Sequence, residues 1–432
     1  MSHGAAVAVR ELRYAAAALL APHRSRGAIE RRQVRGVRRL VAFARTEVEH
    51  YRADPAYDVR LDRITDLARL PTLTKATLRA GVERFHAPHP GWFQTDQTSG
   101  STGQVVQVRH DAHAYGYHGA TLLRRFLAAG CRPWWTIAHL KPYPRPARWF
   151  QRFGVFRRTV VPAGLPEREL VERVLALRPH VVMGYPVMLR ALLRELSDAE
   201  LATLRRRLRL VLSESELLTD EHRERLTAGF GVPVRDEYSA FEVLTIAHEC
   251  RAGAMHVDED RLVLEVVDEA HRPVPDGTPG LAVVTHFRER AMPLVRYVIE
   301  DRIMALPGRC SCGSRFRRMR LLDGRTEDAV TLPDGRRVYF AAFVAIGLTI
   351  PGLAEYAVRQ DSTGSITLSL LLDRAAGRAF DEVAAQIRQR LRDQLGFDLP
   401  LAVVEVDRIE LTPGGKARLV TSAYRPPTGP PP

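Results

Sequence analysis

The sequence predicts an α/β protein with a large N-terminal part and a small α+β unit at its C-terminal end. Helical and strand patterns alternate between residues 165 and 236, which is typical of parallel strands joined by helical crossovers. Strand patterns separated by turn-rich segments follow from about residue 243 to 305. After Asp328, strand patterns surround one long helical pattern, which indicates a compact unit of about 100 residues.

The N-terminal part opens with apolar residues at helical spacing between about residues 25 and 50, under a high density of arginine. In the alternating region, helices are predicted at 165–177, 186–196 and 219–230, and strands at 180–185, 208–213 and 231–238. Ligands of open α/β sheets bind outside the carboxyl ends of the strands. Glu216 and the run from Asp236 to Glu242 follow strands, so they fall where a ligand is expected.

The later strand patterns cover residues 261–268, 280–287 and 293–299 and suggest a β subdomain. In the C-terminal unit, strands are predicted at 354–360, 366–372 and 402–409, with a helix near 377–395.

Length and composition bound the class of protein. The chain has 432 residues, of which 45% are hydrophobic, so it can bury a substantial core in two or three domains. Four cysteines in such a chain do not make a disulfide framework, which favours a reducing compartment. The apolar stretch 14–22 is short for a secretory signal, and no stretch approaches the roughly 20 apolar residues of a membrane span. We therefore expect a cytoplasmic protein.

The formal net charge is +14, which permits anionic partners. The basic segment 25–50 lacks interleaved aromatic residues, so a solvated helix face is favoured there over an RNA-binding arm, and nucleic acid is not the expected partner. Only three of the 64 basic residues are lysines, namely Lys75, Lys141 and Lys416. A planar guanidinium does not replace an ammonium at a tight phosphate site, so a lysine retained in this chain is a candidate functional residue.

A glycine, serine and threonine run is the first motif that indicates chemistry. It comprises Thr98, Ser99, Gly100, Ser101, Thr102 and Gly103. Its glycines let the backbone approach a ligand, and its hydroxyl and N–H groups can donate hydrogen bonds to phosphate oxygens. Taken alone, the run fits a plain turn equally well. The chain lacks the GxxxxGK[ST] and GxGxxG motifs, which removes the basis for a P-loop NTPase or a dinucleotide-binding protein.

Five motifs in order give a more specific signal than any one of them. They are TSGSTG at 98–103, DEYSAFE at 236–242, LVRYVIED at 294–301, GRTED at 324–328 and TPGGK at 412–416. Their order and spacing resemble the adenylate-forming superfamily. Within it the chain is most similar to the phenylacetate-CoA ligase family and its relatives in polysaccharide and natural-product gene clusters. The resemblance runs from Leu70 to Arg418.

The resemblance implies an enzyme that uses ATP and Mg²⁺ to convert a carboxylic acid, aromatic or small, to an acyl-adenylate. The acyl group then passes to an acceptor, with coenzyme A favoured. It also implies an N-terminal adenylation domain at 1–326 and a small mobile α+β domain at 327–432, with a hinge at Asp328. Lys416 would be the lysine that completes adenylation.

The resemblance also assigns roles around the nucleotide. The run 98–103 would bind the β- and γ-phosphates, and Tyr238 would stack on adenine. Glu242 would bind Mg²⁺, a role that suits a hard carboxylate ligand. Asp301 would hold both ribose hydroxyls. The other positions assigned to the nucleotide are Glu216, Asp236 and Arg325.

The acyl pocket is expected around Trp135, His139 and Tyr185. The chain departs from the family pattern at three positions beside the nucleotide. Ser239 and Phe241 stand where relatives usually read Tyr-Gly-x-Ser/Thr-Glu, and Glu300 replaces the usual glycine before the ribose aspartate.

A second constellation consists of Cys250, His256, Cys310 and Cys312. A Cys₃His set in two sequence-local pairs is typical of a closed tetrahedral Zn²⁺ site, and related ligases show the same elements. The alternative is three reduced thiols and a polar histidine.

Two other functions remain open from the sequence. The acceptor could be an amine or a carrier-protein thiol, which would make the chain an amide synthetase or a loading enzyme. A more remote alternative is an inactive ligase-like protein that binds nucleic acid.

Overall fold

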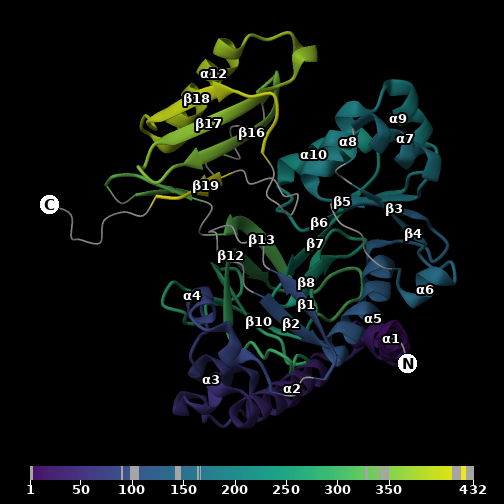
Figure 1. Cartoon of the computed structure of the whole chain (residues 1–432), viewed down its shortest axis with the longest axis vertical. Coiled ribbons are helices and arrows are strands. Elements are labelled where there is room, and N and C mark those ends of the chain that lie inside the picture. The colour runs from purple at the N-terminus through teal and green to yellow at the C-terminus, as the bar shows by residue number, and fades with distance from the viewer. Residues whose placement is uncertain are drawn as a thin grey trace. The chain divides into compact units, whose positions relative to one another are not determined.

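The computed structural model describes residues 3–88, 91–97, 107–141, 147–162, 165, 167–325, 329–334, 336–339, 343, 350–410 and 420–424 (Figure 1). The chain divides into two compact units. The larger comprises Met1–Leu218 and His222–Leu322, and the smaller comprises Thr219–Glu221 and Asp323–Pro432. The α/β class predicted from the sequence is confirmed.

An eleven-stranded mixed sheet forms the centre of the larger unit. In spatial order its strands are β10 (Val263–Val267), β11 (Pro279–Thr285), β12 (Tyr297–Leu306), β13 (Arg318–Arg325), β9 (Met255–Val257), β8 (Leu244–Glu249), β7 (Val234–Ala240), β6 (Leu210–Glu214), β5 (Val181–Gly184), β3 (Ile137–Lys141) and β4 (Arg158–Pro162). The strands from β4 to β7 are parallel, whereas β7, β8 and β9 pair antiparallel.

The strands after residue 243, which the sequence assigns to a β subdomain, join the same sheet by antiparallel pairing. The reason is local. A tight turn follows β7, and β8 returns antiparallel along its free edge with Glu237 opposite His248. A hairpin needs only such a turn, whereas a further parallel strand would need a crossover of a dozen or more residues.

Helical crossovers join the parallel strands, as the alternating pattern predicts. The helices of this region are α5 (Ala112–Ala129), α6 (Trp149–Arg152), α7 (Glu167–Leu177), α8 (Pro186–Glu195), α9 (Asp198–Arg205) and α10 (Asp220–Phe230). The side chain of Asp111 caps α5 by accepting from the N–H groups of His113 and Ala114. Gly130 ends that helix in the left-handed conformation, at φ 98°. Helix α9 was not among the predicted elements.

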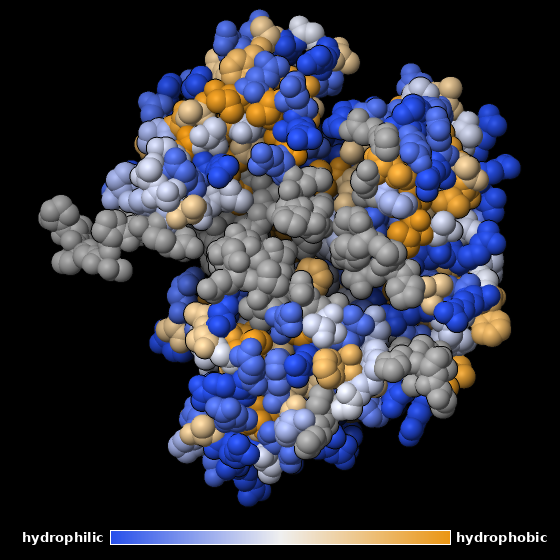
Figure 2. Space-filling model, in the orientation of Figure 1, coloured by the Kyte–Doolittle hydropathy of each residue, from blue (hydrophilic) through white to orange (hydrophobic). Residues whose placement is uncertain are grey.

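The N-terminal helices are α1 (His3–Leu20), α2 (Arg26–Glu47), α3 (Glu49–Arg52) and α4 (Lys75–Arg79). Helix α2 corresponds to the predicted arginine-rich helix. It buries Val37, Leu40 and Val41 in the main hydrophobic cluster, while Arg31 and Arg35 are exposed. Hydrophilic residues accordingly predominate over α2 and α3 at the bottom of the space-filling view (Figure 2).

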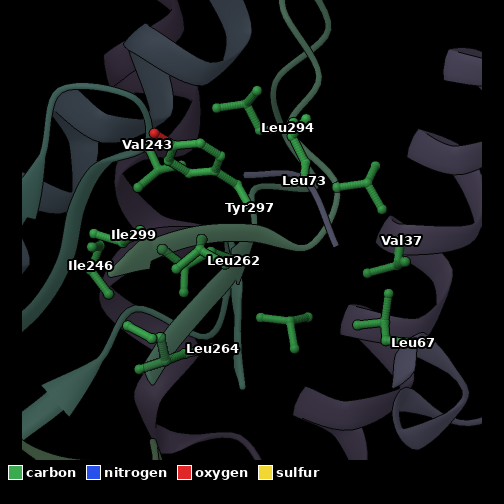
Figure 3. Close-up of a cluster of buried hydrophobic side chains, with 14 of the residues drawn as sticks. Val37, Leu67, Leu73, Val243, Ile246, Leu262, Leu264, Leu294, Tyr297 and Ile299 are labelled. Carbon is green, nitrogen blue, oxygen red and sulfur yellow. The ribbon is translucent and has the colours of Figure 1, made fainter. Parts of the chain in front are cut away.

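The main hydrophobic cluster ties the N-terminal segments to the antiparallel half of the sheet. Figure 3 shows Val37 and Leu67 on one side of this cluster and Ile246, Leu262 and Leu264 on the other. Leu73 extends the contact to strand β12. Its N–H donates to the carbonyl of Arg296, and its carbonyl accepts from the N–H of Val298. Strand β12, which carries Asp301, is thereby held by a buried segment.

The smaller unit has a four-stranded sheet in the order β18 (Leu401–Glu405), β17 (Ile366–Leu372), β16 (Leu353–Gln360) and β19 (Val420–Ser422). Helix α12 (Phe380–Leu395) buries Val383, Ile387 and Leu391. A two-stranded ribbon consists of β14 (Ala329–Thr331) and β15 (Arg337–Tyr339). The buried side chain of Gln360 joins ribbon and sheet by bonding the N–H and carbonyl of Thr331. None of the helices in the described part of the chain is long and apolar enough to cross a membrane.

Candidate active site and metal centre

Tyr238 and Asp301 are brought together from strands β7 and β12. The hydroxyl of Tyr238 donates a hydrogen bond to Oδ2 of Asp301 over 2.6 Å. Buried positions alternate with half-buried ones along β7, and Tyr238 is a buried position, with 5% of its surface exposed. The two residues assigned to adenine and to ribose therefore lie within hydrogen-bonding reach of each other.

Glu242 lies in the turn between β7 and β8 and is buried. Its Oε1 accepts a hydrogen bond of 3.0 Å from the hydroxyl of Tyr297, at the start of β12. Tyr297 is a supporting residue that the sequence analysis did not single out. Its place in the LVRYVIED motif could have indicated this role, because a tyrosine in a buried strand needs a polar partner for its hydroxyl. Strand β12 thus contacts both candidate groups, Tyr238 through Asp301 and Glu242 through Tyr297.

Residues that neighbour the candidate positions in the sequence have a left-handed backbone conformation. Glu300, which precedes Asp301, has φ 71°, Ser215 has φ 68° and Leu244 has φ 63°. The left-handed conformation costs a residue with a side chain about 1–2 kcal/mol, whereas glycine adopts it freely. The glycine usual in relatives at position 300 is therefore explained by the backbone that this position requires. In this chain a glutamate adopts the same strained conformation.

Several predicted residues lie outside the described part of the chain. The run from Thr98 to Gly103 is one, and Asp328 and Lys416 are the others. The strands on either side of the run are described. They are β1 (Phe93–Gln97) and β2 (Gln107–Asp111), which pair antiparallel with Gln97 opposite Gln107. Arg325 is the last residue of β13, and its side chain is outside the described part.

A buried ionic cluster lies at the carboxyl ends of the parallel strands. Oε1 of Glu214, at the end of β6, is 2.7 Å from Nε2 of His139 and 2.5 Å from Nζ of Lys141. Tyr185 follows β5, and its hydroxyl accepts from Nζ of Lys141 over 3.4 Å. His139 and Tyr185, both assigned to the acyl pocket, therefore meet through Lys141 and Glu214.

Burial and the neighbouring groups set the protonation states of His139 and Glu214 in this cluster. Burial lowers the pKa of His139 to about 4, although the neighbouring Glu214 opposes that shift, so the imidazole is neutral at pH 7. Burial alone would raise the pKa of Glu214, but the Lys141 ammonium and His139 hold it well below its usual range. Glu214 is therefore an ionised carboxylate paired with Lys141.

Trp135 does not join this cluster. It lies before the amino end of β3, where its ring stacks on His180 at 5.9 Å between centroids and 2° between planes. Since His139 and Lys141 lie toward the carboxyl end of the same strand, the strand rise of about 3.3 Å per residue separates the two regions. The structure thus brings together two of the three pocket candidates.

Glu216 and Asp236 occupy positions near the parallel strand ends. Oε2 of Glu216 accepts a 3.3 Å hydrogen bond from the N–H of Val187, in the first turn of helix α8. Asp236 is buried in β7, and its N–H donates to Oε2 of Glu249. Burial, reinforced by the charge of Glu249, raises the pKa of the Asp236 carboxyl well above its ordinary value.

The four residues of the predicted Cys₃His set converge. Their ligand atoms all lie within 4.8 Å of one another. Sγ of Cys250 is 3.7 Å from Sγ of Cys310, and Sγ of Cys312 is 3.3 Å from Nε2 of His256. Tetrahedral coordination with Zn–S bonds of about 2.3 Å separates neighbouring sulfurs by about 3.8 Å. The spacing fits one zinc ion.

The tautomer of His256 also fits a metal ligand. Nδ1 of His256 lies 3.1 Å from the carbonyl oxygen of Phe316, which can only accept. Nδ1 therefore carries the proton, and Nε2 presents its lone pair toward the thiols. Metal-bound histidines are commonly oriented by such a second hydrogen bond. The fourth cysteine, Cys131, is buried in a separate apolar cluster and is not part of this set.

Comparison with known proteins agrees with the five motifs. No family model matches the chain. A phenylacetate-coenzyme A ligase of Thermus thermophilus is 26% identical over 421 residues, which cover 89% of this chain and 94% of that protein. Protein CapK of Staphylococcus aureus is 21% identical over 382 residues, covering 82% of this chain and 80% of that protein.

Among solved structures, 2-hydroxyisobutyryl-CoA ligase in the postadenylation state, in complex with R3-HIB-AMP, superposes with a TM-score of 0.76. The match covers 95% of this chain and 92% of that one at 18% identity, so it establishes the fold. The sequence relatives cover nearly the same length. The chain is therefore similar over most of its length to phenylacetate-coenzyme A ligases, and it shares the fold of 2-hydroxyisobutyryl-CoA ligase.

Proposed function

We propose that this chain is an acid–thiol ligase that activates a carboxylic acid with ATP and transfers the acyl group to coenzyme A. The observation that carries the proposal is the convergence of Tyr238, Asp301, Glu242 and Tyr297 on two strands and one turn. These residue types suit adenine, ribose and a nucleotide-bound metal. The relatives named phenylacetate-coenzyme A ligase support the same reaction.

The first half-reaction joins the acid to AMP. A carboxylate oxygen of the acid attacks the α-phosphorus of ATP, the bond from that phosphorus to the β-phosphate oxygen breaks, and pyrophosphate leaves. Asp301 would accept hydrogen bonds from the ribose hydroxyls, and Tyr238 would stack on adenine. Glu242 would hold Mg²⁺, which neutralises charge on the phosphates. In the second half-reaction the thiol attacks the acyl carbonyl, loses its proton and releases AMP.

The remaining nucleotide contacts are assigned from the motifs. The run 98–103 would donate hydrogen bonds to the β- and γ-phosphates, and Lys416 would stabilise the charge that develops in adenylation. Glu216, Asp236 and Arg325 complete the proposed set. We further propose that residues 327–432 act as a mobile domain with its hinge at Asp328.

We assign the acid to the region of His139 and Tyr185. This region lies at the carboxyl ends of β3 and β5, where ligands of α/β sheets bind. Lys141 and Glu214 form an ion pair there, so the region offers polar groups as well as the Tyr185 ring. An aromatic or small organic acid with a polar substituent fits this mixture.

We propose Zn²⁺ as a structural ion bound by Cys250, His256, Cys310 and Cys312. A closed Cys₃His set leaves no position for substrate, so the ion would join β8 and β9 to the segment before β13. Reduced thiols also support a cytoplasmic location.

An ATP–pyrophosphate exchange screen tests the proposal. The purified chain with Mg²⁺ and ATP is supplied with aryl, amino and short-chain acids in turn, and exchange of labelled pyrophosphate is expected with at least one. Products formed with coenzyme A, amines and a carrier protein then separate the thioester ligase from the amide synthetase and the loading enzyme. Binding of RNA or DNA with a steep salt dependence, without exchange for any acid, would instead support the inactive nucleic-acid-binding protein.

A further inference from the structure

His110 is a fully buried histidine, 0% exposed, in the strand β2 that follows the glycine-rich run. Both of its ring nitrogens have partners far away in the sequence. Nε2 lies 2.9 Å from the carbonyl oxygen of Phe241, the residue before Glu242. Nδ1 lies 3.1 Å from Oε2 of Glu289, in the connection between β11 and β12.

The donor and acceptor inventory fixes the orientation of this ring. A carbonyl oxygen only accepts, so Nε2 must carry a proton toward Phe241. Oε1 of Glu289 accepts from the backbone N–H groups of Asp111, Arg290 and Ala291, which holds the carboxyl group in place. Its Oε2 then faces Nδ1 with one further proton between the two atoms. Each polar atom of this junction has a partner in one arrangement of the ring.

The ring therefore joins three segments that each lead to a proposed nucleotide contact. Strand β2 pairs with β1, and the run 98–103 lies between these two strands in the sequence. Phe241 directly precedes the proposed magnesium ligand Glu242. The connection containing Glu289 leads into β12 with Tyr297 and Asp301. A buried apolar residue could fill the same space without the cost of burying an imidazole and a carboxyl group.

We propose that His110 is a positioning residue that fixes strand β2 relative to the turn that carries Glu242. This inference rests on the proposed function. His110 touches neither substrate nor metal in this role. It acts through the Phe241 carbonyl, so that the carboxylate proposed to hold Mg²⁺ keeps its position relative to strand β2. Misplacement of such groups by about 1 Å can lower a rate by about 100-fold.

Two isosteric variants separate the two contacts of the ring. In His110→Gln the side-chain amide extends to the former Nε2 position and can still donate to the Phe241 carbonyl. In His110→Asn the shorter amide reaches the former Nδ1 position and Glu289, and it leaves Phe241 without its donor. His110→Ala removes both contacts. His113→Ala is the control, because His113 is an exposed histidine three residues further along the chain.

The variants are assayed by ATP–pyrophosphate exchange with an acid that the wild-type chain accepts, over a range of Mg²⁺ and ATP concentrations. We expect the kcat of His110→Ala and His110→Asn to fall about 10- to 100-fold, with a higher Mg²⁺ requirement. His110→Gln should recover most of the rate, and His113→Ala should match the wild type. Melting temperatures measured in parallel show whether each variant is folded.

Two results would overturn the positioning role. One is a wild-type rate and Mg²⁺ requirement in folded His110→Asn. The other is an equal loss in the folded Asn and Gln variants, because that would make the Phe241 contact irrelevant. If His110→Ala does not fold, the exchange rates of His110→Gln and His110→Asn still test whether the Phe241 contact matters. Absence of exchange in the wild type with every acid would contradict the proposed function itself, so the two failures are distinguishable.

Discussion

At the residue scale, the proposed nucleotide contacts are side chains held by one another before any ligand binds. The carboxylate of Asp301 accepts a hydrogen bond from the hydroxyl of Tyr238, and that of Glu242 accepts one from the hydroxyl of Tyr297. A carboxylate with a fixed orientation loses less conformational entropy when it binds ligand. The same bonds imply a competition, since ribose hydroxyls would share the Asp301 carboxylate with Tyr238.

Asp301→Ala should therefore weaken ATP binding far more than Tyr238→Phe does. The alanine variant loses hydrogen bonds to a charged group, each worth about 1.5–3 kcal/mol, and we expect the KM for ATP to rise about 10- to 100-fold. Tyr238→Phe keeps the ring for adenine and removes only the donor to Asp301, so its KM should stay within a few-fold of wild type. Steady-state exchange kinetics measure both values, and equal increases would argue against a ribose contact at Asp301.

His139 gives the stability of the protein a pH dependence of defined sign. Its pKa is lowered to about 4 in the folded chain, from an ordinary value of about 6.5, because burial disfavours the imidazolium. The unfolded chain therefore binds this proton first, and stability falls as the pH is lowered from about 6.5 to 4. The contribution is about 3 kcal/mol. Above pH 6.5 it is constant.

His139→Gln should remove this part of the pH dependence while its amide can still bond Glu214. Urea unfolding at pH 5 and pH 8 measures the difference for each variant. We expect the loss of stability between the two pH values to be smaller in His139→Gln than in the wild type. An identical loss in both would mean that His139 is not the neutral buried base described here.

Residues of this kind mark the limit of prediction from sequence. Tyr238, Glu242 and Asp301 were assigned roles because they sit in recognisable motifs, and the structure brings Tyr238 to Asp301. His110 and Tyr297 look like ordinary strand residues in the sequence. Their roles depend on partners more than 50 residues away, at Phe241 and Glu242, which no local pattern reveals.

At the element scale, the proposed metal ligands lie in and beside the strands β8, β9 and β13. Cys250 directly follows β8, His256 lies in β9, and Cys310 and Cys312 precede β13. Strand β9 pairs with both β8 and β13, so the sheet itself brings Cys250 and His256 close to Cys310 and Cys312. The sequence could suggest the ligand set from its spacing, whereas the pairing of β9 with a strand some 60 residues later required the structure.

Cys310→Ser should abolish stoichiometric zinc and lower the melting temperature, because a tetrahedral site with one weak ligand binds the ion less tightly and loses the stabilisation that binding provides. Cys131→Ser is the matched control, since Cys131 is a buried cysteine outside the set. Elemental analysis of protein purified without chelator gives the zinc content of both variants. Zinc that is substoichiometric in the wild type and unchanged in Cys310→Ser would remove the site.

The elements themselves were largely predictable where periodicity is strong. The pattern at 366–372 gave strand β17, and the patterns at 165–177 and 186–196 gave helices α7 and α8. The order of the strands was not accessible in the same way. Hydrophobic alternation says that a strand has a buried face, but it does not say which neighbour it pairs with. The strands expected to form a β subdomain belong to one continuous eleven-stranded sheet with the parallel strands.

At the scale of the whole molecule, the proposed chemistry is divided between the two units. Tyr238, Glu242 and Asp301 belong to the larger unit, and Lys416 belongs to the smaller one. The proposed half-reactions need different groups, and the assigned residues are distributed over both units. Lys416 is also one of only three lysines in a chain that otherwise uses arginine.

Lys416→Ala should accordingly separate the two half-reactions. Adenylation needs a compact positive charge at the phosphates, so we expect ATP–pyrophosphate exchange to fall by about 100-fold or more, in the range seen for loss of a group that stabilises transition-state charge. Thioester formation from supplied acyl-adenylate and coenzyme A should remain largely intact, since its leaving group is AMP and no pyrophosphate is formed. Lys75→Ala serves as a comparison, because Lys75 is a lysine of the larger unit. Undiminished exchange in Lys416→Ala, or equal loss of both half-reactions, would show that this lysine does not have the adenylation role.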